Sequence, residues 1–356
     1  MAAQDRKAGV KGLAYICARD IQTTRINWLW ENRIAKGKVT MFAGEGGKGK
    51  STVLAYLTSL ITRGASFPVD NSAMSRGKVV ILSAEDGEGD TIKPRLCASN
   101  AELDKVFVLR GTEEYDSRGN VVYSPVTLDT DISRIDDVLT EIGGVVLLII
   151  DPITAYLGKI KDHNNSEVRM LISRLTMIAE KHQLAIILNT HLSKAAEGSK
   201  RSAAARITGS IAYVNAARAV YLFAEDPDNP GEKRVIIPVK NNIGKDSDGY
   251  RYAVKQCTID DGIVANYVEF DSELVTDRAD DIVAGEGANS KAKKVEAEEF
   301  LIDILKYGSV SASEILKKGN EQGFSNATLY RVKKDLNIKD AQAVGGRHKI
   351  WFFGAD

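Results

Sequence analysis

Short, largely apolar runs alternate with longer amphipathic stretches along the first 270 residues of the chain. Each run has the length of a buried strand, and the spacing of leucine and isoleucine over residues 52–62 and 166–182 is helical. The predicted strands are residues 38–43, 78–83, 145–150, 185–189, 216–223 and 235–240. Apolar strands that alternate with helices are typical of a mostly parallel sheet covered on both faces. The pattern therefore predicts an α/β fold.

The pattern changes near residue 271. Residues 272–291 are rich in acids, glycine, alanine and serine without clear periodicity, which predicts a flexible linker. Residues 292–356 carry three helical patterns and then two β-prone runs around a Gly-Gly pair, the outline of a small winged-helix domain. We therefore expect a core over residues 31–271. Residues 1–30 are expected to form an N-terminal extension that contacts a neighbouring subunit.

Composition narrows the classes of protein that fit this outline. The chain has 356 residues, of which 44% are hydrophobic, so two domains with a sizeable core are expected. No apolar run approaches the ~18 residues of a membrane span, and no signal-peptide pattern precedes the core. Three scattered cysteines suggest neither a disulfide framework nor a zinc site, so a reducing cytoplasm is expected. Lysine plus arginine equal aspartate plus glutamate at 48 each, so any nucleic-acid contact must come from local patches.

Residues 44–51 match the phosphate-binding pattern G-x-x-x-x-G-K-S in full, between a predicted strand and a predicted helix. The glycines let backbone N–H groups close around phosphate oxygens, and the helix presents its positive end to the same anion. Lys50 is expected to reach the β- and γ-phosphates, and the Ser51 hydroxyl to bind Mg²⁺. The predicted ligands are ATP and Mg²⁺, and the predicted binding residues are Gly44, Glu45, Gly46, Gly47, Lys48, Gly49, Lys50, Ser51 and Thr52.

Three further strands end in polar residues that suit the same site. Asp151 follows the strand at 145–150 and can hold the Mg²⁺ shell, because the carboxyl ends of parallel strands share one edge of the sheet. Glu85 follows the strand at 78–83 and is the candidate base for the attacking water. The alternative for Glu85 and Asp86 is a solvated turn. His191 either senses the γ-phosphate or is an ordinary packed or surface histidine.

Hydrolysis also needs a cation that neutralises charge in the transition state, and a neighbouring subunit often supplies an arginine for this purpose. Arg218, near the start of the predicted strand at 216–223, is the leading candidate. Lys240, at the end of the next strand, is the second candidate. The alternative for both residues is a surface or strand-edge cation.

Taken in order, these residues resemble the RepA-like hexameric replicative helicases, which have a RecA-type core. The resemblance covers roughly residues 28–270. It implies that Glu85, in Ala84-Glu85-Asp86, is the catalytic glutamate, that Asp151 is the Walker B aspartate and that His191 is a sensor. It also implies that Arg218, in the segment Gly209-Ser210…Asn215-Ala216-Ala217-Arg218, is a finger acting across a subunit boundary. The resemblance further implies that the protein is encoded by a plasmid, phage or other mobile element.

Two groups of basic residues are candidate DNA contacts, because flexible lysines and arginines bind phosphates without sequence preference. One group lies in the loops that follow Asp151 and His191, and its alternative is a solvated basic loop. The other lies on the third helix and wing of the C-terminal domain, which is expected to bind duplex DNA or a protein. The residues are Lys159, Lys161, Lys194, Lys200, Arg201 and Arg206 in the first group, and Arg331, Lys333, Lys334 and Arg347 in the second.

The sequence therefore predicts an ATP-driven motor on single-stranded DNA, most simply a helicase that forms a homohexameric ring. Three alternatives remain open. The first is a recombinase-like filament, since ring closure alone separates it from a helicase. The second is a DNA-binding regulator or helicase loader that acts through the winged helix. The third is an ATPase of a defence or mobile-element system that DNA only triggers.

Overall fold

The computed structural model describes residues 15–192, 202–207, 211–245, 247–285, 290–324, 326–342 and 349–353. Within these residues, no helix is both long and apolar enough to cross a lipid bilayer.

A nine-stranded sheet forms the centre of the larger domain, in the order β13-β12-β11-β10-β3-β9-β8-β4-β5. Strands β10, β3, β9, β8, β4 and β5 pair in parallel, and β11, β12 and β13 add antiparallel pairs at one edge. The bounds are β3 (Val39–Gly44), β4 (Lys78–Ser83), β5 (Val106–Val108), β8 (Val145–Asp151), β9 (Ala185–Thr190), β10 (Ala219–Glu225), β11 (Arg234–Asn241), β12 (Gly249–Thr258) and β13 (Val264–Val275). The predicted α/β class with a mostly parallel sheet is confirmed.

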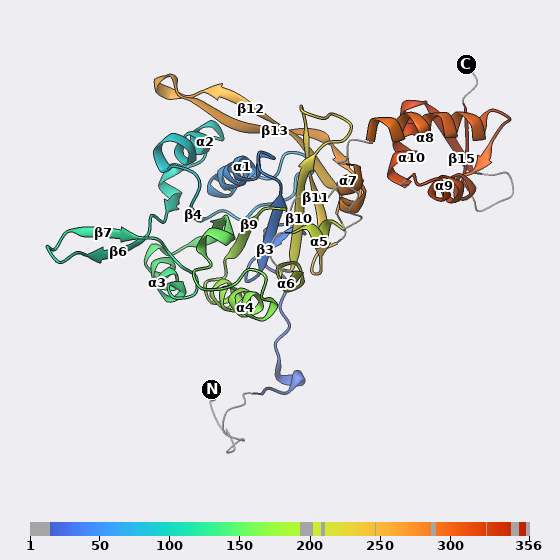
Figure 1. The fold of residues 1–356 in the computed structure, drawn as a ribbon. Helices are drawn as coiled ribbons and strands as arrows, with labels where there is room; N and C mark the ends of the chain where they lie inside the picture. Colours follow the sequence, from blue (N-terminus) through green and yellow to red (C-terminus); the bar gives the residue numbers. More distant parts are fainter. Residues whose placement is uncertain are drawn as a thin grey trace.

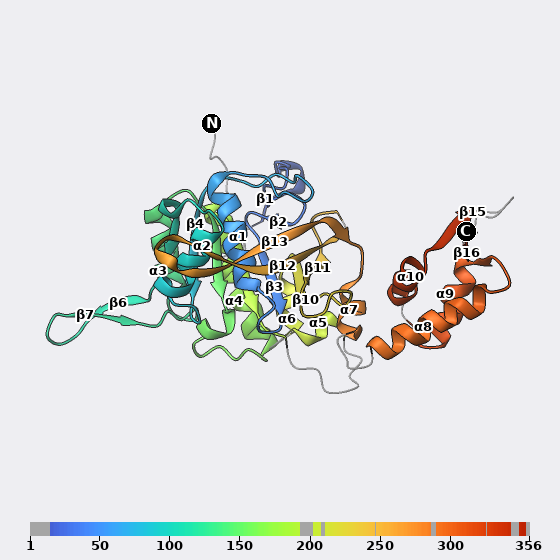
Figure 2. The same cartoon turned by 90° about the horizontal axis from the view of Figure 1, so that it is seen from above.

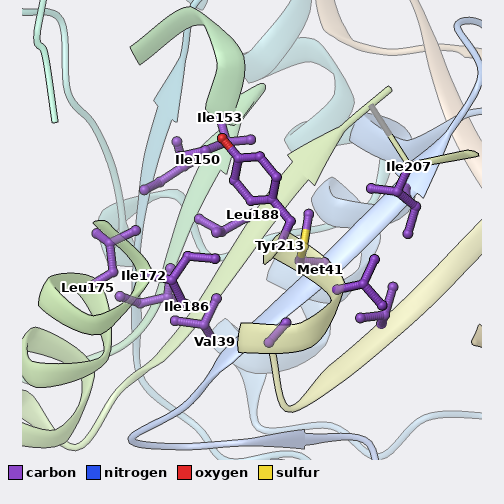
Figure 3. Packing of buried hydrophobic residues seen from close by; sticks show 14 of the residues in the cluster. Val39, Met41, Ile150, Ile153, Ile172, Leu175, Ile186, Leu188, Ile207 and Tyr213 are labelled. Carbon is purple, nitrogen blue, oxygen red and sulfur yellow. The ribbon is translucent and has the colours of Figure 1, made fainter. Parts of the chain in front are cut away.

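Helices cover both faces of this sheet (Figure 1). One face packs against α3 (Ile132–Ile142), α4 (Asn165–His182) and α6 (Ile211–Ala216), and the other against α1 (Lys50–Arg63) and α2 (Lys93–Ala98). Successive strand residues point to opposite faces, so Met41 belongs to the first core and Phe42 to the second. Figure 3 shows Ile172 and Leu175 of α4 and Tyr213 of α6 beside the strand residues of the first core. Burial on both faces explains why the strands read as continuous apolar runs.

Helices on both faces of the sheet begin and end where local chemistry interrupts the backbone hydrogen bonds of the helix. The Asn164 side chain accepts hydrogen bonds from the N–H groups of Ser166 and Glu167 at the start of α4, which satisfies donors that have no partner inside the helix. Helix α1 ends at Arg63, and the next residue, Gly64, has a φ of 68° that suits a residue without a Cβ atom.

Several elements differ from the sequence prediction. β13 runs through Val275, and α7 (Ala279–Gly285) follows it, with Ala279 and Ile282 buried in the main core. The expected linker over residues 272–291 is therefore replaced by ordered core structure as far as residue 285, because a few apolar side chains in a polar stretch suffice to anchor it. Trp30 also packs on Phe67 and Tyr250, so the end of the expected extension belongs to the core.

Smaller elements complete the larger domain. A two-stranded unit, β1 (Trp28–Trp30) with β2 (Ile34–Ala35), precedes β3. The hairpin of β6 (Thr112–Tyr115) and β7 (Val121–Ser124) projects from the body, and the long β12–β13 hairpin lies along the side that carries α1 and α2 (Figures 1 and 2). The one-turn helix α5 (Ala203–Arg206) precedes α6.

The C-terminal residues form a separate unit with its own core (Figure 2). Its elements are α8 (Ser290–Leu305), β14 (Val310–Ser311), α9 (Ala312–Glu321), α10 (Asn326–Asp335), β15 (Ile338–Gln342) and β16 (Lys349–Phe353). The three strands pair in the order β14-β16-β15, and Leu301, Ile315, Leu329 and Trp351 pack together beneath the helices. The three helices and the β15–β16 pair lie where the sequence pattern predicted three helices and a hairpin, and β14 adds a third strand.

Candidate nucleotide-binding site

The loop between β3 and α1 has the geometry of a phosphate cradle. Gly47 and Gly49 have φ angles of 74° and 81°, which side chains with a Cβ atom rarely adopt. A Cβ atom added at Gly44 would lie 2.4 Å from the Phe223 carbonyl oxygen, whereas one added at Gly46 or Gly47 would meet nothing within 4 Å. The first glycine is therefore needed for packing against β10, and the middle of the loop borders open space.

Asp151 lies at the carboxyl end of β8, beside the start of α1. Its Oδ2 atom accepts a 2.7 Å hydrogen bond from the Ser51 hydroxyl, and its Oδ1 atom accepts one from the Asn189 side-chain amide. Asp151 is buried, and burial raises the pKa of its carboxyl above the ordinary aspartate range despite these two hydrogen bonds. The structure thus brings together the two side chains that the sequence assigned to Mg²⁺, and adds Asn189 as their neighbour.

Lys50 is a second buried charge of the site. Its ammonium group donates hydrogen bonds to the carbonyl oxygens of Gly44 (2.8 Å) and Glu45 (2.9 Å). Burial lowers the pKa of Lys50 to about 8, although the nearby carboxylates of Asp151, Glu85 and Glu45 favour the charged form. A phosphate group in the loop would supply the compensating negative charge directly.

Glu85 lies just beyond the carboxyl end of β4, and β4 pairs with β8 through Ser83 and Asp151. The Glu85 side chain is 61% exposed, and its Oε1 atom is 3.5 Å from Nε2 of His191. Its neighbour Asp86 is held in an ion pair with Arg95 at 2.5 Å. Glu85 is therefore the one of the two adjacent acids whose carboxylate stays open to water, and His191 lies beside it.

The residues present fit a nucleotide with a divalent cation. Asn189 Oδ1 is buried beside Asp151 without a hydrogen-bond partner in the described part of the chain. No cluster of three or more histidine, cysteine or acidic residues that could hold a metal by itself occurs there either. This is the situation in which Mg²⁺ binds through one or two protein oxygens together with substrate phosphates. Ser51 and Asp151 would hold the cation.

Two side chains of the predicted cradle point away from it. Glu45 forms a 3.0 Å ion pair with Arg206, whose side chain is only 4% exposed. Lys48 forms a 3.1 Å ion pair with Glu225. The prediction that Arg206 contacts DNA does not fit its burial, because a guanidinium enclosed beside the phosphate loop is not available to a strand outside. Only the backbone of Glu45 and Lys48 lines the cradle.

A second strand supports the loop from behind. The Tyr252 hydroxyl of β12 donates to the Lys48 carbonyl oxygen, and a Cβ atom at Gly49 would lie 2.8 Å from Val254. No sequence pattern pointed to Tyr252, Glu225 or Arg206 in this role, because each lies more than 150 residues from the loop along the chain.

Arg218 lies near the amino ends of the parallel strands, whereas the phosphate loop follows the carboxyl end of β3. Its N–H donates to the Val39 carbonyl oxygen at the start of β3, and the next residue of β10 pairs with Thr40. The loop begins at Gly44, five residues further along β3, which corresponds to roughly 16 Å of strand. Lys240 lies at the same end of the sheet as Arg218, paired with Val220. Neither cation approaches the phosphate loop of its own subunit.

The other predicted DNA contacts divide into three groups. Lys159 and Lys161 follow β8 with exposed side chains, and Lys334 is exposed on α10. Lys194, Lys200, Arg201 and Arg347 lie outside the described residues, as do Gly209 and Ser210. Arg331 and Lys333 are instead engaged within the chain.

Arg331 forms an ion pair with Asp228 of the larger domain at 2.5 Å. Lys333 pairs with Asp340 and lies over the Trp351 ring. These acids turn both cations inward, so the predicted DNA role of Arg331 and Lys333 does not fit this arrangement. Arg331 joins the two domains instead.

Comparison with known proteins agrees with this geometry. A family model described as an AAA domain matches residues 17–197, which include the phosphate loop, Glu85, Asp151 and His191. A comparison with curated proteins gives no match. With half of its length matched, and with the phosphate loop and the buried aspartate side by side, the chain belongs to the AAA domain family of P-loop ATPases.

Proposed function

We propose that this protein hydrolyses ATP between identical subunits and uses the energy to move on single-stranded DNA, most simply as a hexameric ring helicase. The observation that carries the proposal is the separation of Arg218 from the phosphate loop of its own chain, at opposite ends of the parallel strands. If Arg218 takes part in hydrolysis, a complete site needs two copies of the chain. Shared sites of this kind let one subunit sense the nucleotide state of the next.

Each side chain would have a separate task. The backbone of the loop and Lys50 bind the phosphates, and Ser51 and Asp151 would hold Mg²⁺, whose charge would offset that of the phosphate oxygens. Glu85 orients and deprotonates the attacking water, and its exposed carboxylate suits that role. His191, within 3.5 Å of Glu85, can report on the γ-phosphate. Arg218 of the neighbouring subunit stabilises the transition state.

DNA binding is supported by the exposed lysines in the segment that follows β8. Lys159 and Lys161 are exposed beyond Asp151, so phosphate contacts there would be close to the nucleotide. The Lys159 N–H donates to Asp129 and the Lys161 N–H to Glu167. These bonds hold the backbone and leave the ammonium groups directed to solvent. Such cations give salt-dependent binding that is independent of sequence.

The test is ATP hydrolysis with and without single-stranded DNA, on protein whose mass in solution is measured with ATP present. Faster turnover with DNA, in an oligomer, is the expected result, and unwinding assays and electron microscopy would then separate a ring from a filament. A monomer or dimer whose slow hydrolysis ignores DNA would overturn the proposal.

The three-helix unit at the C-terminus favours one second candidate, a DNA-binding regulator or helicase loader that acts through a winged helix. Residues other than Arg331 and Lys333 would have to contact the DNA duplex, because these two cations are paired within the chain. ATP would then act as a switch by changing how this unit sits on the core. Sequence-specific duplex binding by the full chain that changes with ATP would favour this candidate over the motor.

A further inference from the structure

Lys240 makes an unusual set of contacts beside Arg218. Its ammonium group donates to three backbone carbonyl oxygens, those of Val214 (2.8 Å), Asn215 (2.9 Å) and Ala217 (2.8 Å). These carbonyls belong to the end of α6 and the turn that leads to Arg218. A lysine ammonium has three protons, and here each has an acceptor.

The surroundings of Lys240 show that it stabilises the turn between α6 and Arg218. A positive charge at the carboxyl end of a helix stabilises carbonyl groups that have no partner inside the helix. Lys240 is also half-buried, and both burial and the nearby Arg218 charge lower its pKa. Moving the ammonium out to a phosphate would break three hydrogen bonds and expose three carbonyls.

The backbone around Arg218 is fixed on the remaining sides. The Arg218 N–H donates to the Val39 carbonyl oxygen, and its own carbonyl oxygen accepts from the Asn242 N–H. Asn242 follows directly on β11, the strand that carries Lys240. Hydrogen bonds to β3 and to the residue after β11 thus fix the Arg218 backbone, and Lys240 fixes the turn before it. The Arg218 side chain itself is exposed.

We infer that Lys240 is a positioning residue that fixes the direction in which Arg218 leaves the subunit, and that it is not a second finger. This inference rests on the proposed function, in which Arg218 enters the neighbouring ATP site. A small displacement of the guanidinium would misalign it with the developing charge. It would leave ATP binding to Lys50 and Ser51 of the other subunit nearly unchanged.

The test is a double-mutant cycle on the full chain, measured as kcat and KM for ATP. Lys240→Met should lower kcat about 10²-fold, the order of loss that a 1 Å misplacement produces, with KM nearly unchanged. In the Arg218→Ala background, Lys240→Met should have no further effect. A further loss in that background would show that Lys240 contacts the phosphates itself and would overturn the inference.

The matched control is Lys78→Met. Lys78 lies at the start of β4 and donates to the Ile142 carbonyl oxygen at the end of α3 (2.8 Å), so it makes the same kind of helix contact far from Arg218. Lys78→Met should leave kcat unchanged. An equal loss of kcat in both lysine variants would show that Lys240 contributes only to the stability of the fold.

If Arg218→Ala alone retains full turnover, the proposed function fails. If Arg218→Ala is slow and Lys240→Met is not, only the positioning role fails.

Discussion

Mixing two inactive variants provides the sharpest test of a shared ATP site. Arg218→Ala keeps the phosphate loop but lacks the finger, and Lys50→Ala keeps the finger but lacks the loop lysine. The roughly 16 Å of β3 between Val39 and Gly44 is more than an arginine side chain can span. The two defects should therefore complement each other at interfaces where one variant supplies Lys50 and the other supplies Arg218.

The size of the effect follows from the arrangement of subunits. Each variant alone should lose about 10³-fold or more in kcat, which is about 4 kcal/mol of transition-state stabilisation. In a ring that exchanges subunits freely at a one-to-one ratio, an interface is competent only when both of its sides are intact. Random assembly gives roughly one quarter of such interfaces. Turnover of the mixture should thus recover to roughly a quarter of the parent rate.

Steady-state ATP hydrolysis across a series of mixing ratios measures this recovery, with each variant alone at the same total concentration as the control. The rate should be highest near equal amounts and fall toward both ends. A mixture that stays as slow as its components, while mass measurements confirm mixed oligomers, would refute an Arg218 finger acting in trans.

Three further predictions follow from the site and the domain contact. Glu85→Gln should lower kcat by about 10²- to 10⁴-fold while ATP affinity, measured by titration calorimetry, stays close to that of the parent; loss of binding instead would show a structural role. Because burial lowers the pKa of Lys50 to about 8 and phosphate favours its charged form, ATP binding near pH 8 should take up protons and weaken as pH rises further. Calorimetry in buffers of different ionisation enthalpy measures that uptake, and its absence in the parent, or its persistence in Lys50→Ala, would contradict the assignment. Arg331→Asp should detach the C-terminal unit and raise the radius of gyration by X-ray scattering, because it sets a carboxylate beside Asp228 and Asp277, whereas the same change at the exposed Lys334 of α10 should not; equal radii in the parent and both variants would show that this ion pair does not hold the unit in place.

The nucleotide site was largely predictable because its parts are local in sequence. Each candidate residue follows a strand whose apolar pattern is visible, and parallel strands end at a common edge. Thus Lys50, Glu85, Asp151 and His191 could be placed near one another before their contacts were known. Asn189 was visible only as the end of a strand, since its hydrogen bond to Asp151 depends on how β8 and β9 pair.

The basic residues could not be assigned in the same way. Arg206, Arg331 and Lys333 look like other surface cations in the sequence, and their acidic partners lie on different segments. Residues 272–285 likewise lack a clear period, and the few apolar side chains that anchor them find their partners only in the folded core.

The α/β class, the phosphate loop and the strand ends that carry its chemistry could be predicted from the sequence alone, because they depend on local spacing and on the period of apolar residues. Only the folded chain shows which cations are engaged in ion pairs, that Arg218 lies away from the phosphate loop of its own subunit, and that Lys240 donates to the turn before Arg218. Those facts depend on which distant segments meet, such as β10 with β3 and β11 around Arg218, and Asp228 with Arg331. Local sequence carries no record of such pairings.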